Sequence, residues 1–413
     1  MNKLNFPIQL RLLVILVLAV SVSCTNREKE EQTKADTLLT IPFAELVKDK
    51  REVKLSEFAS DIKLIQLENT PEALIGTFEN IEYSKDFIFI MCWTQPIMQF
   101  SRTGKFIKQI GKIGKGPGEY SYCTKMSIDE KNKHIYIQTV EFNIVVFNFD
   151  GDYIKTIQCP DMKYYVWSRD SMLVSYFEPI SGNETFVFVE HNEQGDTLQG
   201  IPNYISFDES EQANPFRSSS FREQNFSYRF EDKLHLKGCY NDTVYSYDEN
   251  NQLTPKFFID LKQHKLPEEL VYEKKWNRSM PDGLCWTGIH ETSNYLFLPY
   301  GYHYDSSQPE LEKEERGYVL YNKQANSGAA VEEAKQAGFT DDLNGGPHFR
   351  PILTYDHTAV MLVSALDLKQ YLNSDRFKNQ AVKFPEEKEK LVQLNKTLKE
   401  DDNHFIVEVS LKE

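Results

Sequence analysis

The sequence contains little cysteine, and its cysteines lie far apart. Six occur in 413 residues, and no two form a CxxC pair. A secreted scaffold held together by disulfides would show a dense and even set. Setting aside Cys24, which is treated below, leaves Cys92, Cys123, Cys159, Cys239 and Cys285. We expect these five to be small buried hydrophobic residues, with one incidental disulfide as the alternative.

Positive charge is also scarce. The chain carries 47 Lys and Arg against 62 Asp and Glu, which gives a formal net charge of −15 at pH 7. Binding to nucleic acid or to anionic lipid headgroups requires clustered Lys and Arg. The composition therefore excludes nucleic acid as a partner.

Common catalytic and cofactor-binding motifs are missing. The glycine-rich stretch "IGKIGKGPGEY" (110–120) resembles a phosphate-binding loop only at first sight. Pro117 follows Gly116 where a P-loop has lysine, and the stretch lies between predicted strands instead of opening a helix. No G-x-S-x-G, H-E-x-x-H or calcium-loop pattern occurs, and the nine histidines are scattered. We assign no cofactor and no catalytic residue from motifs.

Long hydrophobic runs are absent except near the N-terminus. There "LLVILVLAV" (12–20) is too short to span a bilayer comfortably, and it leads into "SVSC" (21–24). The segment resembles a lipoprotein signal in residues 1–23, with Cys24 as the acylated first residue of the mature protein, although Ser21 replaces the more usual leucine. The alternative is an ordinary cleaved secretory signal. Residues 24–37 are polar and lack aromatics, which indicates a flexible tether.

What the sequence does contain is a repeat. Six times, an alternating apolar stretch is followed by a short polar break and a second such stretch, the pattern of a hairpin of half-buried strands. The six copies span residues 81–93, 126–140, 165–178, 228–239, 289–301 and 353–365. Five are followed by a second hairpin of matching form, in which Gly104 aligns with Gly151 at a turn that requires positive φ. Two hairpins make a four-stranded sheet, the unit of a β-propeller.

One blade lacks its own outer hairpin. Its missing strands can come from residues 62–68 and 404–412, because pairing the chain ends in one blade removes exposed sheet edges. We therefore predict an all-β, six-bladed propeller over residues 38–413, closed by its N- and C-terminal strands.

Two segments depart from the repeat. Residues 328–351 begin with good helix formers, which predicts a short helix and an ordered loop between the fifth and sixth blades. Residues 367–403 predict two helices, the second starting after Pro385 with Leu391, Leu394 and Leu398 at helical spacing. We expect these helices to pack on the ring, with a partner-binding surface as the alternative.

Several segments together resemble a known family. They are the N-terminal signal with Cys24, "FSRTGKFIKQIGKIGKGPGEY", "DTVYSYDENNQLTPKFFIDL", "FTDDLNGGPHFRP" and "LKEDDNHFIVEVSLK". The chain is similar to the six-bladed β-propeller lipoproteins of Gram-negative gut bacteria, distant relatives of NHL-repeat propellers. The resemblance implies the fold and a cell-envelope location, as an outer-membrane lipoprotein facing the periplasm or the cell exterior. It assigns no activity.

Three groups of residues are candidates for a site or a structural role. Charge and hydrogen-bonding capacity gather in a loop at Asp341, Asp342, Asn344, His348 and Arg350, for which turn capping is the alternative. A signature loop of Gly114, Gly116, Pro117, Gly118, Glu119 and Tyr120 is expected to be structural, with Glu119 accepting backbone hydrogen bonds. Acidic residues at the hairpin breaks could face a central channel, but turn chemistry alone explains them; they are Glu82, Asp129, Asp170, Glu231, Glu291 and Asp356.

Two classes of function follow. The first is a non-catalytic binding or scaffold module, anchored to the membrane through Cys24, that presents the propeller to a glycan, a peptide or an envelope protein. The second is a lactonase-like or lyase-like enzyme with a metal in the central channel. We favour the first, because the sequence offers no convergent set of metal ligands.

Overall fold

The chain falls into two units, residues 1–40 and 41–413, and only residues 38–40 of the first are described. The computed structural model describes residues 38–412 except 117, 142, 159–163, 170–171, 177–182, 193, 195, 204–225, 232, 239–240, 249, 266–283, 287, 303–315 and 332–336.

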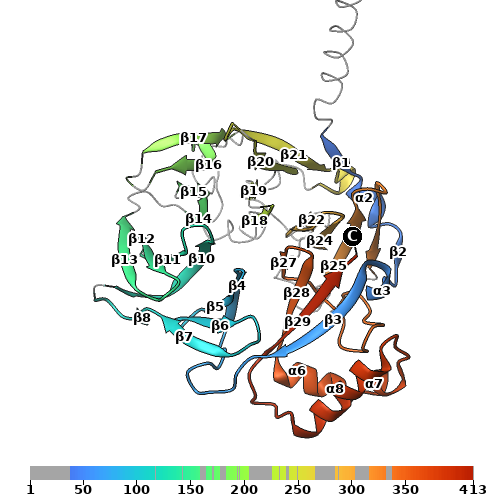
Figure 1. Cartoon of the computed structure of the whole chain (residues 1–413). Helices are drawn as coiled ribbons and strands as arrows, with labels where there is room; N and C mark the ends of the chain where they lie inside the picture. Colours follow the sequence, from blue (N-terminus) through green and yellow to red (C-terminus); the bar gives the residue numbers. More distant parts are fainter. Residues whose placement is uncertain are drawn as a thin grey trace, which may run out of the picture. The chain divides into compact units, whose positions relative to one another are not determined.

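Six small antiparallel sheets follow one another around a ring (Figure 1), which confirms the six-bladed β-propeller. Each of the six predicted inner hairpins forms the two innermost strands of one blade. The strands of blades 1 to 3 are β4 (Phe78–Tyr83), β5 (Phe87–Cys92), β6 (Ile97–Ser101) and β7 (Phe106–Ile110); β10 (Cys123–Asp129), β11 (His134–Thr139), β12 (Asn143–Asn148) and β13 (Tyr153–Gln158); and β14 (Tyr164–Arg169), β15 (Met172–Tyr176), β16 (Phe186–His191) and β17 (Thr197–Pro202).

Blades 4 and 5 continue the series, with an interrupted inner strand in blade 5. Blade 4 contains β18 (Phe226–Phe230), β19 (Lys233–Lys237), β20 (Thr243–Tyr247) and β21 (Leu253–Ile259), and a short 3-10 helix, η2 (Lys262–His264), follows it. Blade 5 contains β22 (Leu284–Trp286) and β23 (His290–Glu291), which both pair with β24 (Tyr295–Tyr302), then β25 (Arg316–Asn322) and β26 (Ser327–Val331). A two-residue strand, β2 (Lys50–Arg51), adds to β26 in parallel.

Blade 6 closes the ring as predicted. Its inner strands are β27 (Leu353–Tyr355) and β28 (Thr358–Val363). Next comes β29 (Phe405–Leu411) from the C-terminal end of the chain, and the outermost strand is β3 (Ala59–Gln66) from near the start. Both neighbours of β29 are therefore brought in from far away in sequence.

Burial differs between the strands of a blade because each blade packs between two others. In β5 every residue after Phe87 is buried, since both faces of this strand contact apolar side chains. In the outermost strand β13, only Ile157 is buried. This difference in burial explains why strands inside a blade, such as β5, have continuous apolar sequences, whereas the outermost strands alternate apolar and polar residues.

The outer turns have the predicted backbone conformation. Gly104 has φ 83° and Gly151 φ 84°, and Asn251 has φ 60° in the equivalent turn of blade 4. At Gly104 a Cβ atom would lie 2.3 Å from the Gln66 carbonyl oxygen, so only glycine fits there. The corresponding Gly195 of blade 3 lies outside the described residues.

The prediction of a helix beginning at residue 328 is wrong for residues 328–331, which belong to strand β26, while residues 332–336 lie outside the described residues. Alanine favours a helix locally, but β25 on one side and β2 on the other offer these residues backbone partners, and tertiary pairing outweighs local propensity. The remaining short helices near the N-terminal end are α2 (Phe43–Leu46) and α3 (Leu55–Phe58).

The C-terminal segment contains three helices instead of the predicted two. They are α6 (Ala365–Leu372), α7 (Asp375–Asn379) and α8 (Pro385–Thr397), and α8 includes Pro385 as its first residue, one position before the predicted start. The extra break arises because Ser374 accepts a hydrogen bond from the Phe377 N–H and starts a new helix.

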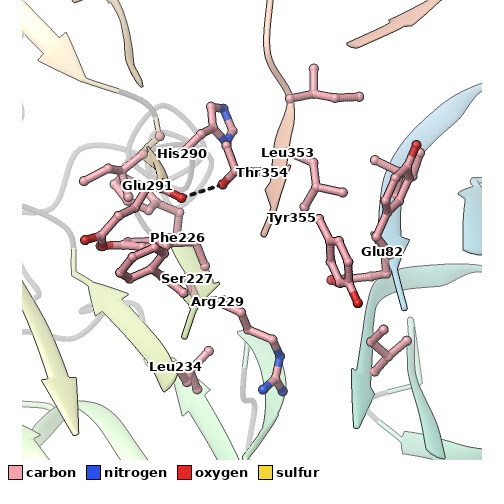
Figure 2. Close-up of a pocket in the computed structure, with 18 of the residues that line it drawn as sticks. Glu82, Phe226, Ser227, Arg229, Leu234, His290, Glu291, Leu353, Thr354 and Tyr355 are labelled. Carbon is pink, nitrogen blue, oxygen red and sulfur yellow. Dashed lines mark hydrogen bonds between the residues drawn. The ribbon is translucent and has the colours of Figure 1, made fainter. Parts of the chain in front are cut away.

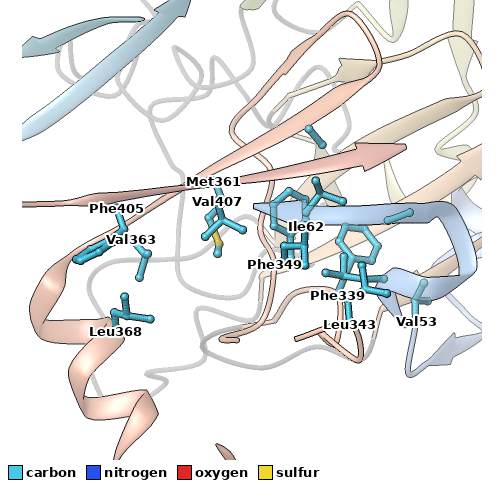
Figure 3. Close-up of a cluster of buried hydrophobic side chains, with 14 of the residues drawn as sticks. Val53, Ile62, Phe339, Leu343, Phe349, Met361, Val363, Leu368, Phe405 and Val407 are labelled. Carbon is cyan, nitrogen blue, oxygen red and sulfur yellow. The ribbon is translucent and has the colours of Figure 1, made fainter. Parts of the chain in front are cut away.

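These helices pack on the ring, as predicted. Leu368 and Leu391 are buried in one cluster with Met361 of β28 and Val407 of β29. Figure 3 shows Leu368 beside these strands. Leu398 is buried in the same cluster, and Leu394 packs against it. The apolar stripe of α8 is thus covered by the protein's own core.

Two of the five cysteines can be assessed. Cys92 and Cys123 are buried and form no disulfide, which confirms the prediction for them. Cys159 and Cys239 lie outside the described residues, as does Cys24. The described part of the chain has no helix that is both long and apolar enough to cross a membrane.

Candidate functional site

The signature loop carries the chain from the outer edge of blade 1 to the centre of blade 2. Two short parallel strands, β8 (Lys112–Ile113) and β9 (Glu119–Tyr120), frame it. The Gly116 N–H donates to the Glu119 carboxylate at 2.9 Å, as expected for Glu119. The buried Tyr120 hydroxyl donates to the Ile110 carbonyl at 2.7 Å and accepts from the Ile97 N–H at 2.8 Å. Gly114 donates to the Tyr120 carbonyl, Gly118 has φ 72°, and Pro117 lies outside the described residues.

The acidic loop before blade 6 is held tightly by its own backbone. The Asp341 carboxylate accepts N–H bonds from Leu343, Asn344 and Gly346, at 3.0, 3.1 and 2.9 Å. Burial raises the pKa of Asp341 to about 6, although these bonds act in the opposite direction. The cavity beside Asp341 and Asn344 has a volume of only about 10 Å³, roughly the space of one water molecule.

Asp342 and His348, two other members of that loop, have different surroundings. Asp342 accepts hydrogen bonds from the Ser56 N–H and hydroxyl, at 2.9 and 2.6 Å, and so ties the N-terminal segment to the loop. His348 is half-buried, and its pKa is lowered by burial and by the charges of Arg376 and Arg350. The bonds to Asp341 are of the turn-capping kind, whereas Asp342 joins two segments that are distant in sequence. Ligand binding by the five loop residues stays a prediction.

A much larger cavity occupies the centre of the ring. Its volume is about 780 Å³, and the innermost strands of blades 1, 2, 4, 5 and 6 line it (Figure 2). Its walls combine apolar side chains, among them Ile81, Phe226 and Leu353, with charged groups of both signs. A cavity of this size and mixed character is typical of small-molecule binding sites.

Three of the charged side chains that line this cavity come from the innermost strands of three different blades. They are Glu82 of β4, Lys125 of β10 and Arg229 of β18. Burial raises the pKa of Glu82, and the charges of Lys125 and Arg229 partly offset that effect. Burial likewise lowers the pKa of Lys125, against the attraction of Glu82. The three groups therefore interact electrostatically across the cavity.

The turn explanation for the acidic residues holds for some of them and is wrong for two. Asp129 accepts hydrogen bonds from the Asn132 backbone and side chain in the turn after β10. Glu231 and Asp356 occupy turn positions, each with φ 50°. Glu82, however, lies inside β4 opposite Phe89, and Glu291 lies in β23. Strand register therefore places Glu82 and Glu291 before the turn. Asp170, the sixth of these acidic residues, lies outside the described residues.

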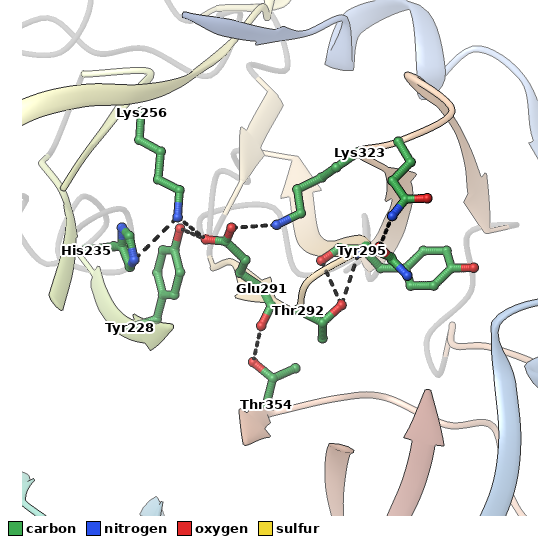
Figure 4. Close-up of polar contacts among 10 residues, drawn as sticks. Tyr228, His235, Lys256, Glu291, Thr292, Tyr295, Lys323 and Thr354 are labelled. Carbon is green, nitrogen blue, oxygen red and sulfur yellow. Dashed lines mark hydrogen bonds and ion pairs between the residues drawn. The ribbon is translucent and has the colours of Figure 1, made fainter. Parts of the chain in front are cut away.

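Glu291 forms the centre of a buried polar cluster between blades 4 and 5 (Figure 4). Its side chain is 0% exposed, and its carboxylate contacts Lys256 Nζ at 3.0 Å and Lys323 Nζ at 2.7 Å. The Tyr228 hydroxyl donates to it at 2.7 Å. The Tyr228 ring stacks on the His235 ring with 4.7 Å between centroids. Burial and the Lys256 charge lower the pKa of His235 to about 3, so its ring is neutral at pH 7.

His290 also lines the inner cavity wall and is ionisable. It precedes Glu291 in β23, and Figure 2 shows it on the wall near Thr354. Burial lowers its pKa to about 4, so at neutral pH it offers an uncharged ring that can donate or accept a hydrogen bond.

Sequence reasoning missed several of these groups. Lys125, Arg229 and His290 were not singled out, although each interrupts the apolar pattern of an innermost strand. A charged residue at such a position in a propeller faces either a neighbouring blade or the central channel, and this was the available signal. Within the described residues, no cluster of three or more His, Cys, Asp or Glu side chains could hold a metal ion.

Comparison with known proteins identifies the family. A family model described as a domain of unknown function, DUF4934, matches residues 38–410. The chain belongs to this family. The match begins at the first described residue and ends within β29, so the DUF4934 domain comprises all six blades and the C-terminal helices.

Solved structures share the fold of this DUF4934 chain. A Bacteroides fragilis NCTC 9343 protein, named as an exported protein, has a TM-score of 0.66 at 16% identity over 91% of this chain and 100% of that chain. At such low identity the likeness shows the fold alone.

Two further structures are more distant. A Bacteroides thetaiotaomicron VPI-5482 protein of unknown function has a TM-score of 0.44 at 8% identity, over 85% of this chain and 76% of that chain. The Staphylococcus aureus virginiamycin B lyase has a TM-score of 0.37 at 11% identity, over 85% and 100% respectively. Both scores are too low to carry an argument. A search of the curated proteins found no match.

Proposed function

We propose that this protein is a lipid-anchored binding module of the cell envelope, which holds a glycan, a peptide or part of an envelope protein without converting it. The observation that carries the proposal is the central cavity of about 780 Å³, with apolar walls and charged groups supplied by five blades. Rigid strands from several blades hold these groups in place, as a pre-formed ligand site requires.

The metal-dependent enzyme is less well supported. Its channel would need at least three convergent ligands, and the described residues contain no such group. The charged side chains that do face the cavity are of mixed sign, which suits recognition of a polar ligand.

We expect a substitution that fills the cavity to abolish ligand binding. Ser227 of β18 lines the cavity, so Ser227→Trp places a large ring in that space. Binding is measured as the shift in melting temperature of the full-length protein with a panel of oligosaccharides and short peptides. At least one compound should stabilise the wild type and leave Ser227→Trp unaffected.

A matched control is available on an outer strand. Thr156 of β13 is exposed and far from the cavity lining, so Thr156→Trp should keep the wild-type response. If no compound stabilises the wild type, or if Ser227→Trp responds equally, the cavity is not a ligand site and the proposal fails.

Lipid attachment at Cys24 belongs to the same proposal. Its support is the lipoprotein-like signal and the fold shared with a protein named as exported. We expect the wild type to incorporate an alkyne-labelled fatty acid and to fractionate with the outer membrane, and Cys24→Ser to lose the label completely. Thr25→Ala is the control and should be labelled normally. An unlabelled wild type, processed at the same site, would instead indicate an ordinary secretory signal.

A further inference from the structure

We propose that the central cavity binds a short zwitterionic peptide, with its carboxylate at Lys125 and Arg229 and its free ammonium group at Glu82. The inference rests on the proposed function, because it names the ligand chemistry of the same cavity.

The first observation is how the cavity charges are spaced. Glu82, Lys125 and Arg229 project from the innermost strands of blades 1, 2 and 4, and Figure 2 shows Glu82 and Arg229 on different walls. In the described part of the chain, the Glu82 carboxylate has no hydrogen bond and no ion pair, although both cations act on it electrostatically. Glu82 thus lines the same cavity as Lys125 and Arg229 without forming an ion pair with either cation, and both cations also have contacts of their own. A ligand that carries both charges can bridge this gap.

The second observation is the charge at the mouth of the cavity. Glu130, Glu231 and Asp356 line it at the turns that follow the innermost strands of blades 2, 4 and 6. This acidic rim, in a chain with a net charge of −15, disfavours entry of a polyanion. Lys125 and Arg229 inside disfavour a polycation. A zwitterion has no net charge and avoids both penalties.

The third observation is that apolar side chains line the cavity together with the charges. Ile81, Phe226 and Leu353 belong to the lining, together with the charged groups. A neutral sugar would cover Glu82 without supplying a compensating charge, and burying an unpaired carboxylate is costly. A short peptide supplies charge at both ends and apolar side chains in the middle, which matches the combination of charged and apolar groups in the lining.

The test uses four versions of one tripeptide, Ala-Leu-Ala, measured by isothermal titration calorimetry with the full-length protein. The versions have free ends, an acetylated N-terminus, an amidated C-terminus, or both modifications. We expect the free peptide to bind about ten- to a hundredfold more tightly than either singly blocked form, since each modification removes one charge-assisted contact.

Variants assign each end of the peptide. Glu82→Gln should abolish the preference for a free over an acetylated N-terminus and retain the preference for a free C-terminus. Lys125→Met should weaken the preference for a free C-terminus and leave the N-terminal preference in place. Glu79 is exposed on the same strand as Glu82 and does not line the cavity, so Glu79→Gln should behave as the wild type.

Each alternative outcome has a definite meaning. Equal binding of all four peptides would overturn the proposal of a zwitterionic ligand. Tighter binding of maltotriose than of the free tripeptide would overturn it as well. Absence of peptide binding also overturns it, while a panel compound that depends on Ser227 would still support the proposed function. If no compound of that panel bound either, both the zwitterionic-peptide proposal and the proposed function would fail.

Discussion

Glu291→Gln is expected to lower the free energy of unfolding by about 2–4 kcal/mol at pH 7. The substitution keeps the size of the side chain but removes the negative charge that two lysines share. Lys256 and Lys323 lie 3.0 and 2.7 Å from the carboxylate, and their side chains are only 26% and 16% exposed. Without the Glu291 carboxylate, the partly buried ammonium groups of Lys256 and Lys323 lose their shared negative partner. Limited access to solvent screens the repulsion between them only partly. Urea denaturation followed by tryptophan fluorescence measures the loss.

The chain offers a matched control on its surface. Glu45 also contacts two lysines, Lys48 at 3.2 Å and Lys262 at 2.9 Å, but its side chain is 48% exposed. Water and salt screen such a surface pair, so Glu45→Gln should leave the unfolding free energy close to the wild-type value. Equal losses for the two variants would show that the burial of Glu291 has no special effect.

The same carboxylate makes stability depend on pH. Burial raises the pKa of Glu291, but the charges of Lys256 and Lys323 outweigh it and hold the pKa below the ordinary 4.5. A group whose folded-state pKa is depressed contributes stability above its unfolded pKa and loses it as the pH falls through the folded value. The difference between wild type and Glu291→Gln should therefore shrink below pH 4.5. A difference that stays constant down to the acid unfolding transition would contradict this assignment.

Val409→Asp should be still more damaging and is expected to prevent stable folding, at a cost of more than about 4 kcal/mol. Val409 is 0% exposed in the closing strand β29. Its register partners are Ala359 in β28 and Ile62 in β3, so a carboxylate there enters the core of the blade that joins the two ends of the ring. The measurements are the soluble yield and the melting curve by circular dichroism.

The next residue in the strand is the control. Ser410 points to the exposed face of β29, so Ser410→Asp changes the same strand without burying charge. Its melting temperature should stay near that of the wild type. If Val409→Asp melted as cooperatively and at the same temperature as Ser410→Asp, the pairing of β29 with β3 would not be essential for closure.

Much of the fold could be predicted because its signals are local. Alternation within each hairpin depends only on neighbouring residues, and it located all six inner hairpins. The closure by residues 62–68 and 404–412 followed from the incomplete sixth blade, because an unpaired edge is unfavourable. Gly104 and Gly151 were equally accessible, since a tight turn with positive φ restricts the residue type.

The failures have the opposite cause. Residues 328–331 favour a helix by composition and form a strand because β25 and β2 lie on either side of them. Glu82 and Glu291 looked like turn residues, and only the strand register shows that each precedes its turn. A shift of one residue in register moves a side chain to the other face of the sheet, and sequence patterns locate such boundaries poorly.

The sequence by itself determined the number of blades, the way the ring closes and the acidic character of the chain, because these depend on short-range patterns and on composition. The tertiary structure decided which charges meet. Glu82, Lys125 and Arg229 come from three blades, and Glu291 joins Lys256 of blade 4 to Lys323 of its own blade. Their proximity arises from closing six sheets around one axis, and no local pattern in the chain records that distance.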